Sequence, residues 1–296
     1  MQSPAATIVV LGTGGTIAGE AASPDDDLGY RSASLPVTAL VGALQLPAAV
    51  AVESEQVAQL DSKDMDFATW RALAVAIEHH LARAEVVGVV VTHGSDTLEE
   101  TAFFLDRVVA PTKPVVLTAS GARGVVAVVA GVVHSARDVR KIHPQRLDAF
   151  GSGDAGPLGV VVDGVLAMRR PWPVAADAAV DVAQLPSADA AWPWVEIVTS
   201  DAGADARALR ALVAAGCAGI VVATTGNGTV HRGLEAALAD AAARGATVLR
   251  ATRCLAGAIV EPAVPGALPS AGALTPQQAR VELIVRLLAA RAAAPR

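Results

Sequence analysis

Short apolar runs alternate with stretches of helical periodicity along most of the chain. The runs are rich in Val, Ile and Leu, and most are apolar throughout, which is typical of strands buried on both faces of a sheet. Apolar residues recur at helical spacing over 67–81, behind Asp66 as a helix N-cap. The predicted strands are residues 8–11, 86–92, 115–118, 125–129, 195–199, 219–223 and 247–251. This alternation predicts an α/β fold with mostly parallel strands joined by crossover helices.

The alternation stops once, between Pro171 and Pro193, where Pro, Ala and Asp prevail and tryptophans are interspersed. Such a composition is typical of a connection between domains. We therefore predict a larger N-terminal domain over 1–171 with a mostly parallel sheet, a linker over 172–192, and a smaller C-terminal parallel α/β domain over 193–296. The predicted helices of the C-terminal domain are residues 206–215, 233–244 and 276–290.

Composition and charge narrow the classes of function. Hydrophobic residues make up 53% of the chain, charged residues 18% and aromatic residues 3%, so we expect a globular protein with an aliphatic core. A formal net charge of -6 without a run of Lys or Arg disfavours nucleic acid and anionic membranes as partners. No stretch is long and apolar enough to span a bilayer, and residues 1–6 lack the basic start of a signal peptide, so we expect a cytoplasmic protein.

The two cysteines give no sign of a metal or redox site. Cys217 and Cys254 lie far apart in the sequence and have no Cys or His companions at ligand spacing. We expect two buried, reduced thiols.

A glycine-rich turn with two threonines follows the first predicted strand. Residues 12–19 read Gly-Thr-Gly-Gly-Thr-Ile-Ala-Gly. A dinucleotide-binding loop of the form Gly-x-Gly-x-x-Gly needs glycine where Ile17 stands, and no helical pattern follows, so nucleotide binding is disfavoured. The glycines instead allow close backbone approach and expose N–H groups around Thr16. These are the conditions for a hydroxyl nucleophile beside an oxyanion site.

A second polar segment follows the strand predicted at 86–92. Residues 92–100 read Thr-His-Gly-Ser-Asp-Thr-Leu-Glu-Glu. Ser95 and Asp96 therefore fall at the carboxyl end of a strand, where open α/β sheets bind ligands. An alternative is that Asp96 only caps the next helix, with Glu99 completing a capping box. The residues alone leave both interpretations open.

Together, these two segments resemble the two signatures of the bacterial L-asparaginase/glutaminase family. Residues 61–65, which read Asp-Ser-Lys-Asp-Met, lie between them as the family requires. The likeness continues through residues 137–141, 156–159, 226–228 and 274–280, and it covers nearly the whole chain.

The resemblance implies a hydrolase that needs no metal and no cofactor. It implies Thr16 as the nucleophile and Tyr30, in a lid after the first strand, as its activating neighbour. It also implies that Ser95, Asp96 and Lys141 form a hydroxyl–carboxylate–lysine group. Without the resemblance, the sequence favours the interpretation of Lys141 as a solvated surface lysine beside Arg137 and Arg140.

The resemblance further implies the substrate and the assembly. The substrate is a small amino-acid amide, L-asparagine, hydrolysed to L-aspartate and ammonia through a threonine acyl-enzyme. Its α-carboxylate and α-ammonium are held by Ser62 and Asp96, respectively. The implied assembly is a homotetramer of two intimate dimers, in which residues of one subunit contact the site of another. The substrate-binding residues implied are Asp61, Ser62, Ser95 and Asp96, and the partner-subunit contacts are Thr229 and Glu261.

The chain departs from the family pattern in two places near the site. Ser95 stands where the family usually has threonine. After the strand at 115–118, only residues 119–123 precede the next strand, where the family has a turn, a loop and a helix. Because parallel neighbours need a crossover of about a dozen residues, we expect an antiparallel hairpin, a strand that leaves the sheet, or an extended detour. The local topology after Thr118 is therefore predicted to be atypical. The alternative function is an impaired or inactive family member with a binding or oligomerisation role.

Overall fold

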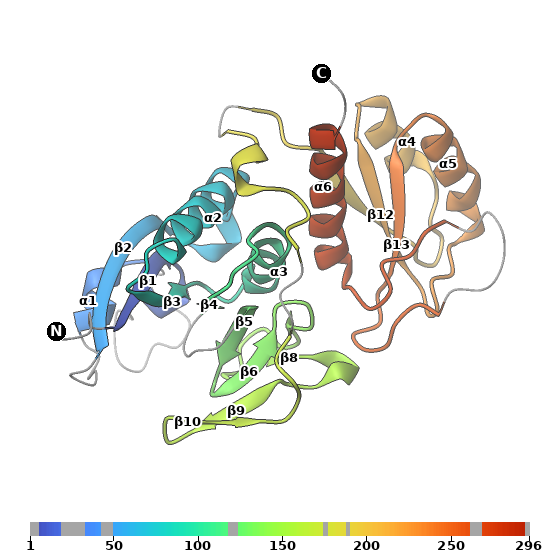
Figure 1. Cartoon of the computed structure of the whole chain (residues 1–296). Coiled ribbons are helices and arrows are strands. Elements are labelled where there is room, and N and C mark those ends of the chain that lie inside the picture. The colour runs from blue at the N-terminus through green and yellow to red at the C-terminus, as the bar shows by residue number, and fades with distance from the viewer. Residues whose placement is uncertain are drawn as a thin grey trace. The chain divides into compact units, whose positions relative to one another are not determined.

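The structure is a computed structural model that describes residues 6–18, 33–42, 50–117, 124–173, 177–187, 190–260 and 268–293, apart from the side chain of Thr16. The chain divides into two compact units, Met1–Asp189 and Ala190–Arg296 (Figure 1). This division lies inside the stretch 172–192 that the sequence predicts as a linker. The predicted domain bounds themselves stay a prediction. None of the described helices is long and apolar enough to cross a membrane.

An eight-stranded mixed sheet forms the centre of the first unit. Its strand order is β10-β9-β6-β5-β4-β3-β1-β2, with parallel pairing from β2 to β5 and antiparallel pairing from β5 to β10. The strands are β1 Ala6–Gly14, β2 Val50–Leu60, β3 Val86–Thr92, β4 Pro114–Leu117, β5 Gly124–Val129, β6 Val132–Ser135, β9 Gly159–Val162 and β10 Val165–Met168. A separate two-stranded ribbon consists of β7 (Arg140–Lys141) and β8 (Phe150–Gly151). The predicted larger, mostly parallel sheet is confirmed, and the antiparallel extension is new.

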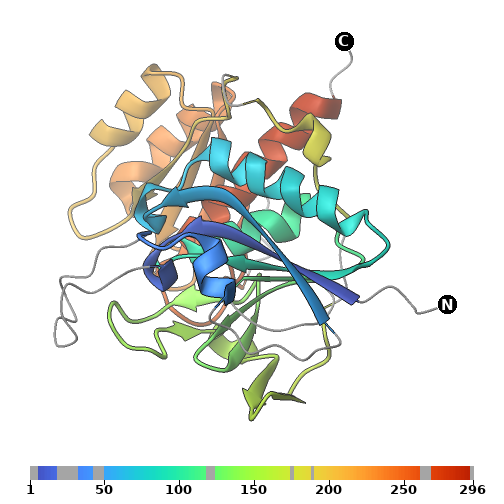
Figure 2. The same ribbon diagram turned by 90° about the vertical axis from the view of Figure 1, so that its left-hand side faces the viewer.

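Two long helices cover the parallel part of this sheet. Helix α2 (Phe67–Leu81) packs on β2 and β3, and α3 (Leu98–Val108) packs on β5 (Figure 2). Asp66 caps α2 as predicted, because its side chain accepts a hydrogen bond from the Thr69 backbone at 2.7 Å. Trp70 of α2 stacks on Phe104 of α3 with ring centroids 4.7 Å apart. The short helix α1 (Val37–Gly42) packs against β1 and β2.

Strands β4 and β5 pair in parallel, with Val116 opposite Val126. Two of the three expected arrangements, an antiparallel hairpin and a strand that leaves the sheet, are therefore wrong. The physical reason is the shortness of the strands. In this register Gly124 lies opposite Pro114, which is three residues before Leu117. The connection from Leu117 to Gly124 therefore has to run back by about 10 Å along the strand direction. The intervening residues 118–123 can span that distance because an extended chain covers up to about 3.6 Å per residue. Their path lies outside the described residues.

An apolar cluster on β4, β5 and β6 is closed by a tryptophan from beyond the sheet. Trp172 packs against it together with Val161 and Leu166. The indole Nε1 of Trp172 is buried, and Gly124, at the start of β5, lies next to it. The buried members of the cluster are Val116, Val126, Val128, Val133 and Leu158. The segment after β10 therefore supplies cover for the strands on either side of the short connection.

The residues that follow Trp172 also belong to the first unit. The 3-10 turn η4 (Val182–Gln184) is closed by a capping box from Asp181. The Ala179 backbone donates to Arg107 of α3 at 2.8 Å, and the Arg71 side chain of α2 donates to the Leu185 carbonyl at 3.4 Å. Much of the predicted linker is thus an ordered strap on α2 and α3.

The second unit is a three-stranded parallel sheet covered by helices, as predicted. Its strand order is β11-β12-β13, and α6 packs against all three strands. The helices α4 and α5 share an apolar cluster with β12 on the other face, around Leu209, Ile220 and Leu234 (Figure 1). The elements are β11 Val195–Thr199, α4 Arg207–Ala214, β12 Gly219–Thr224, α5 Arg232–Ala243, β13 Thr247–Thr252 and α6 Pro276–Ala293.

The packing of Trp172 predicts a large effect of its removal. Trp172→Ala should lower the free energy of unfolding by about 3 kcal/mol, because it strips cover from a buried valine cluster. Urea denaturation measures the loss. The matched control is Trp194→Ala, whose side chain is 39% exposed and which should cost about 1 kcal/mol or less. Equal losses in the two variants would contradict a core role for Trp172.

Candidate active site

Three loops at the carboxyl ends of β1, β2 and β3 meet where glycines let their backbones touch. A Cβ atom on Gly15 would stand 2.3 Å from the Gly94 backbone nitrogen, and one on Gly94 would stand 2.4 Å from the Ser62 Oγ. Gly15 also has φ of 78°, which disfavours any other residue. Its N–H donates to the Leu60 carbonyl at 2.9 Å and so joins the ends of β1 and β2. The glycines of both sequence segments are therefore required by the contact between these loops.

Thr16 begins the 3-10 turn η1 (Thr16–Ala18) directly after Gly15. Its backbone therefore follows the residue that touches the Gly94 loop. Its side chain lies outside the described part of the chain, as do Tyr30 and Glu261 altogether. The structure thus brings the turn that carries the predicted nucleophile to the site, and the predicted roles of these three residues stay predictions.

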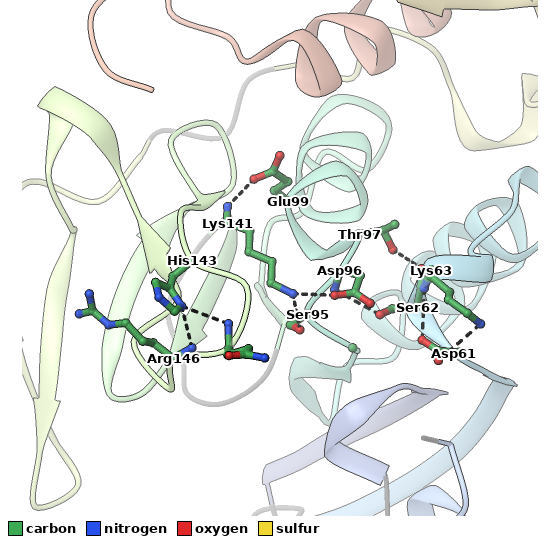
Figure 3. A network of polar contacts seen from close by, with 12 residues as sticks. Asp61, Ser62, Lys63, Ser95, Asp96, Thr97, Glu99, Lys141, His143 and Arg146 are labelled. Atoms are coloured by element: carbon green, nitrogen blue, oxygen red, sulfur yellow. Dashed lines mark hydrogen bonds and ion pairs between the residues drawn. The ribbon is translucent and has the colours of Figure 1, made fainter. Parts of the chain in front are cut away.

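Ser62 lies at the centre of the loop cluster. It opens the 3-10 turn η2 (Ser62–Asp64) after β2 and is only 2% exposed. Its Oγ accepts a hydrogen bond from the Asp96 backbone at 3.2 Å, and its carbonyl accepts one from the Thr97 hydroxyl at 2.7 Å (Figure 3). Asp61 caps η2 by accepting from the Lys63 backbone at 3.3 Å. The loops after β2 and β3 are therefore joined by hydrogen bonds that each pair a side chain with the backbone of the other loop.

Lys141 reaches this cluster from the ribbon strand β7. Its Nζ donates to the Ser95 Oγ at 3.0 Å and to the Asp96 Oδ1 at 2.6 Å (Figure 3). The Lys141 side chain is 20% exposed, whereas that of Asp96 is 50% exposed. The interpretation of Lys141 as a solvated surface lysine is therefore wrong. The predicted hydroxyl–carboxylate–lysine group is assembled, and its carboxylate remains open to solvent.

The capping interpretation of the second segment is wrong as well. Thr97, not Asp96, is the N-cap of α3, and no side-chain bond caps the helix there. Glu99 is turned to the ribbon, where its Oε2 accepts a hydrogen bond from the Lys141 backbone at 2.6 Å (Figure 3). Burial raises the pKa of Glu99 to about 7, and the Lys141 N–H opposes that rise. Sequence reasoning missed this contact because the spacing from Asp96 to Glu99 matches a capping box.

Two buried histidines support the site without entering it. His93 hydrogen-bonds through Nδ1 to the Gly94 carbonyl at 2.7 Å, and His134 hydrogen-bonds to the Ser152 hydroxyl at 2.7 Å. Burial lowers the pKa of each to about 4, so both are neutral at pH 7. The ring of His93 helps to hold the Gly94 turn in place. Within the described ranges, no group of three His, Cys, Asp or Glu side chains is placed to hold a metal ion.

Thr229, in the second unit, lies in a turn with firm internal bonds. Its hydroxyl donates to the Thr225 carbonyl at 3.0 Å and lies 2.8 Å from the Thr225 hydroxyl. Asn227 next to it both donates to and accepts from the Val260 backbone. The turn is exposed, and the predicted contact with a partner subunit stays a prediction.

Two family profiles match this chain over most of its length. Residues 7–123 and 119–173 match the profile described as "Asparaginase, N-terminal". Residues 194–293 match the profile described as "Glutaminase/Asparaginase C-terminal domain". The two N-terminal matches meet at 119–123, between β4 and β5. The chain therefore departs from the family profile at this shortened connection.

Individual proteins are similar along almost the full chain. "L-asparaginase 2" of Escherichia coli (strain K12) is 35% identical over 315 residues, which cover 95% of this chain and 88% of the relative. "Probable L-asparaginase periplasmic" of Haemophilus influenzae is 32% identical, with 95% and 88% covered. The solved structure of "Probable Cytoplasmic L-asparaginase from Campylobacter jejuni" is 32% identical and covers 95% of both chains with a TM-score of 0.87. By profile, by sequence identity and by fold, this chain belongs to the asparaginase/glutaminase family of amidohydrolases.

Proposed function

We propose that the protein hydrolyses the side-chain amide of L-asparagine to L-aspartate and ammonia through an acyl-enzyme at Thr16. The observation that carries the proposal is the contact of the Lys141 ammonium with both Ser95 and Asp96. This group lies beside the turn that bears Thr16, because Gly15 touches Gly94. The names of the relatives support an amide substrate of this kind.

The Thr16 hydroxyl needs activation by a neighbouring group, because an aliphatic hydroxyl is a poor nucleophile at neutral pH. The Thr16 oxygen attacks the amide carbon, and its proton passes, through Tyr30 or the Ser95–Lys141 pair, to the leaving nitrogen. The carbon–nitrogen bond breaks, ammonia leaves, and a threonine ester remains. Water then attacks the ester carbon, which releases L-aspartate and restores the Thr16 hydroxyl. A backbone N–H of the glycine-rich turn would bind the negative charge that develops on the carbonyl oxygen, but not that of Gly15, which donates to the Leu60 carbonyl.

The proposed substrate contacts follow from burial and charge. Asp96 offers a half-exposed carboxylate to the α-ammonium group. Ser62 accepts the Asp96 N–H with its oxygen, which leaves the hydroxyl hydrogen to donate to the α-carboxylate. Asp61 would contribute to substrate binding indirectly, because it caps the η2 turn that holds Ser62 in place.

We further propose a cytoplasmic homotetramer, built as two intimate dimers, in which Thr229 and Glu261 approach the site of a partner subunit. The relative from Campylobacter jejuni carries the word cytoplasmic in its description, although the one from Haemophilus influenzae is described as periplasmic. Both cysteines are free, which suits a reducing compartment. Cys217 is buried as expected, whereas Cys254 is exposed, so its expected burial is wrong.

The alternative of an inactive scaffold is not favoured. It rests on the shortened connection after Thr118, yet β4 and β5 keep parallel pairing across it. The Lys141 contacts form on the neighbouring loop and ribbon, and the pairing of β3 with β4 keeps a regular register.

Removal of the Thr16 hydroxyl tests the proposal directly. Thr16→Ala should lower ammonia release from L-asparagine by about a thousandfold or more, since it removes the nucleophile. Thr16→Ser keeps a hydroxyl and should stay within roughly tenfold of the unaltered enzyme. A coupled ammonia assay measures all three proteins on asparagine and on glutamine. If the unaltered protein and Thr16→Ala release ammonia at the same background rate, the proposed function is wrong.

Removal of the Lys141 charge separates catalysis from stability. Lys141→Met should lower kcat by about 100- to 10,000-fold, because the site loses its proton-transferring ammonium. The free energy of unfolding should change by about 1 kcal/mol or less, since a partly exposed ion pair contributes little. The control is Lys113→Met, whose Nζ donates to the Arg83 carbonyl at the amino end of β4. Full activity in Lys141→Met would contradict the assigned role.

A further inference from the structure

Lys141 is held at both ends by one short segment of the chain. Its ammonium contacts Ser95 and Asp96, while its backbone N–H donates to Glu99 at 2.6 Å. All three partners lie within residues 95–99, at the start of α3. In Figure 3, Glu99 lies on the side of Lys141 away from Ser95. The contacts with the ammonium orient the side chain, and the contact with Glu99 fixes the point from which it extends.

Among the described strands, the ribbon that carries Lys141 pairs with no strand of the large sheet, although both of its ends are bonded to β6. The Val139 N–H before it donates to the Ser135 carbonyl at 2.9 Å, and Ser152 after it is bonded to His134 at 2.7 Å. Strands β7 and β8 form a sheet of their own, with Lys141 opposite Phe150. The Ile142 N–H donates to the Ala149 carbonyl at 2.8 Å and continues the ribbon by one step. A hydrogen bond from the ribbon to α3 is therefore well placed to set the position of Lys141 relative to Ser95.

The charge state of Glu99 is sensitive to its surroundings. The charged groups that face it are Glu100 on the same helical turn and Arg140 and Lys141 on the ribbon. Burial favours the neutral acid most strongly, and Glu100 adds to that effect. The Lys141 N–H, Arg140 and the Lys141 ammonium favour the carboxylate, and the balance places the pKa at about 7. Glu99 therefore changes charge near neutral pH.

We propose that Glu99 is a positioning residue whose ionised carboxylate holds the Lys141 backbone, and with it the ammonium, in register with Ser95 and Asp96. This inference rests on the proposed function. A carboxylate accepts an N–H bond roughly twice as strongly as a neutral acid does. Protonation of Glu99 loosens the ribbon from α3, and the ammonium then loses its fixed distance from the Ser95 hydroxyl.

The direction of the pH effect follows from the raised pKa. Below about pH 7 Glu99 is mostly protonated, so kcat falls as pH falls through that value. The free energy of unfolding changes in the opposite direction: it falls as pH rises. Because the pKa is raised above the ordinary value of 4.5, the folded state holds the proton longer than the unfolded chain does. The contribution of Glu99 to the free energy of unfolding is therefore fully present below about pH 4.5, and it is lost as the pH rises through about 7.

The kinetic test compares Glu99→Gln with a matched control one residue along. Glu99→Gln keeps an acceptor oxygen but cannot ionise, so kcat at pH 8 should fall about tenfold, KM should stay within about twofold, and the acid limb near pH 7 should disappear. Glu99→Ala loses the acceptor and should fall about 100-fold in kcat. Glu100→Gln should keep kcat within about threefold and move the acid limb to lower pH, because it removes a negative charge that opposes ionisation of Glu99.

A second readout does not depend on catalysis. The amide proton shift of Lys141, followed by NMR in the full chain, should titrate with a midpoint near pH 7. That titration should vanish in Glu99→Gln and move to lower pH in Glu100→Gln. A Lys141 amide that does not titrate overturns the proposal whatever the activity. An unchanged acid limb in Glu99→Gln overturns it as well.

The two proposals fail in distinguishable ways. If the unaltered protein releases no ammonia from asparagine or glutamine, the proposed function fails, and the Lys141 amide titration alone decides whether Glu99 holds the ribbon. If the protein is active but Glu99→Gln raises KM and leaves kcat unchanged, the proposed function stands and the positioning role is wrong.

Discussion

The close approach of three loops at Gly15, Gly94 and Ser62 is the constraint on which the candidate site depends: the Gly15 and Gly94 backbones touch, and the Ser62 side chain packs against Gly94. With less than 2.5 Å between a hypothetical Cβ on either glycine and its nearest neighbour, no side chain fits at Gly15 or Gly94. This contact brings the turn before Thr16 against the loop that carries Ser95. Parallel pairing of β1, β2 and β3 makes it possible, because their carboxyl ends lie along one edge of the sheet. The parallel sheet thus places the three loops along one edge, and the glycines allow these loops to come into contact.

Electrostatics in the site follow from what the loops bury and what they leave open. Ser62 is buried, Glu99 is half-buried, and Asp96 faces solvent. An exposed carboxylate beside a shielded ammonium suits a ligand that itself carries a positive group. The buried neutral His93 adds a hydrogen bond to the loop without adding charge. The ionised carboxylate of Asp96 therefore faces solvent, whereas the supporting side chains of His93 and Glu99 are neutral and partly protonated, respectively, near pH 7.

The sequence predicted the parts of the site that are local and missed those that depend on distant contacts. Strands β1 and β3 read as continuous apolar runs, so the polar residues at their ends stood out. Lys141 lies in a strand of two residues whose partners are far away in the chain, and only the family resemblance pointed to it. Glu99 matched a capping box, and the spacing could not show that it faces a ribbon.

The edge strand β2 carries Glu53 and Glu55 and is half-exposed, so its pattern lacked the apolar signal of a buried strand. The expected failure of β4 and β5 to pair in parallel assumed a helical crossover, which two strands paired over only four residues do not need.

The segment that begins at Trp172 and continues into the strap changes which parts of this protein can be separated from one another. Its tryptophan closes a valine cluster, and its backbone is bonded to α3 through Ala179. A fragment cut at residue 171 would lack both, although the sequence places the end of the first domain there. Expression of the N-terminal half as an independent module therefore calls for an end point near residue 189, where the strap is complete. Fusion or permutation designs have to leave that strap attached to the sheet it covers.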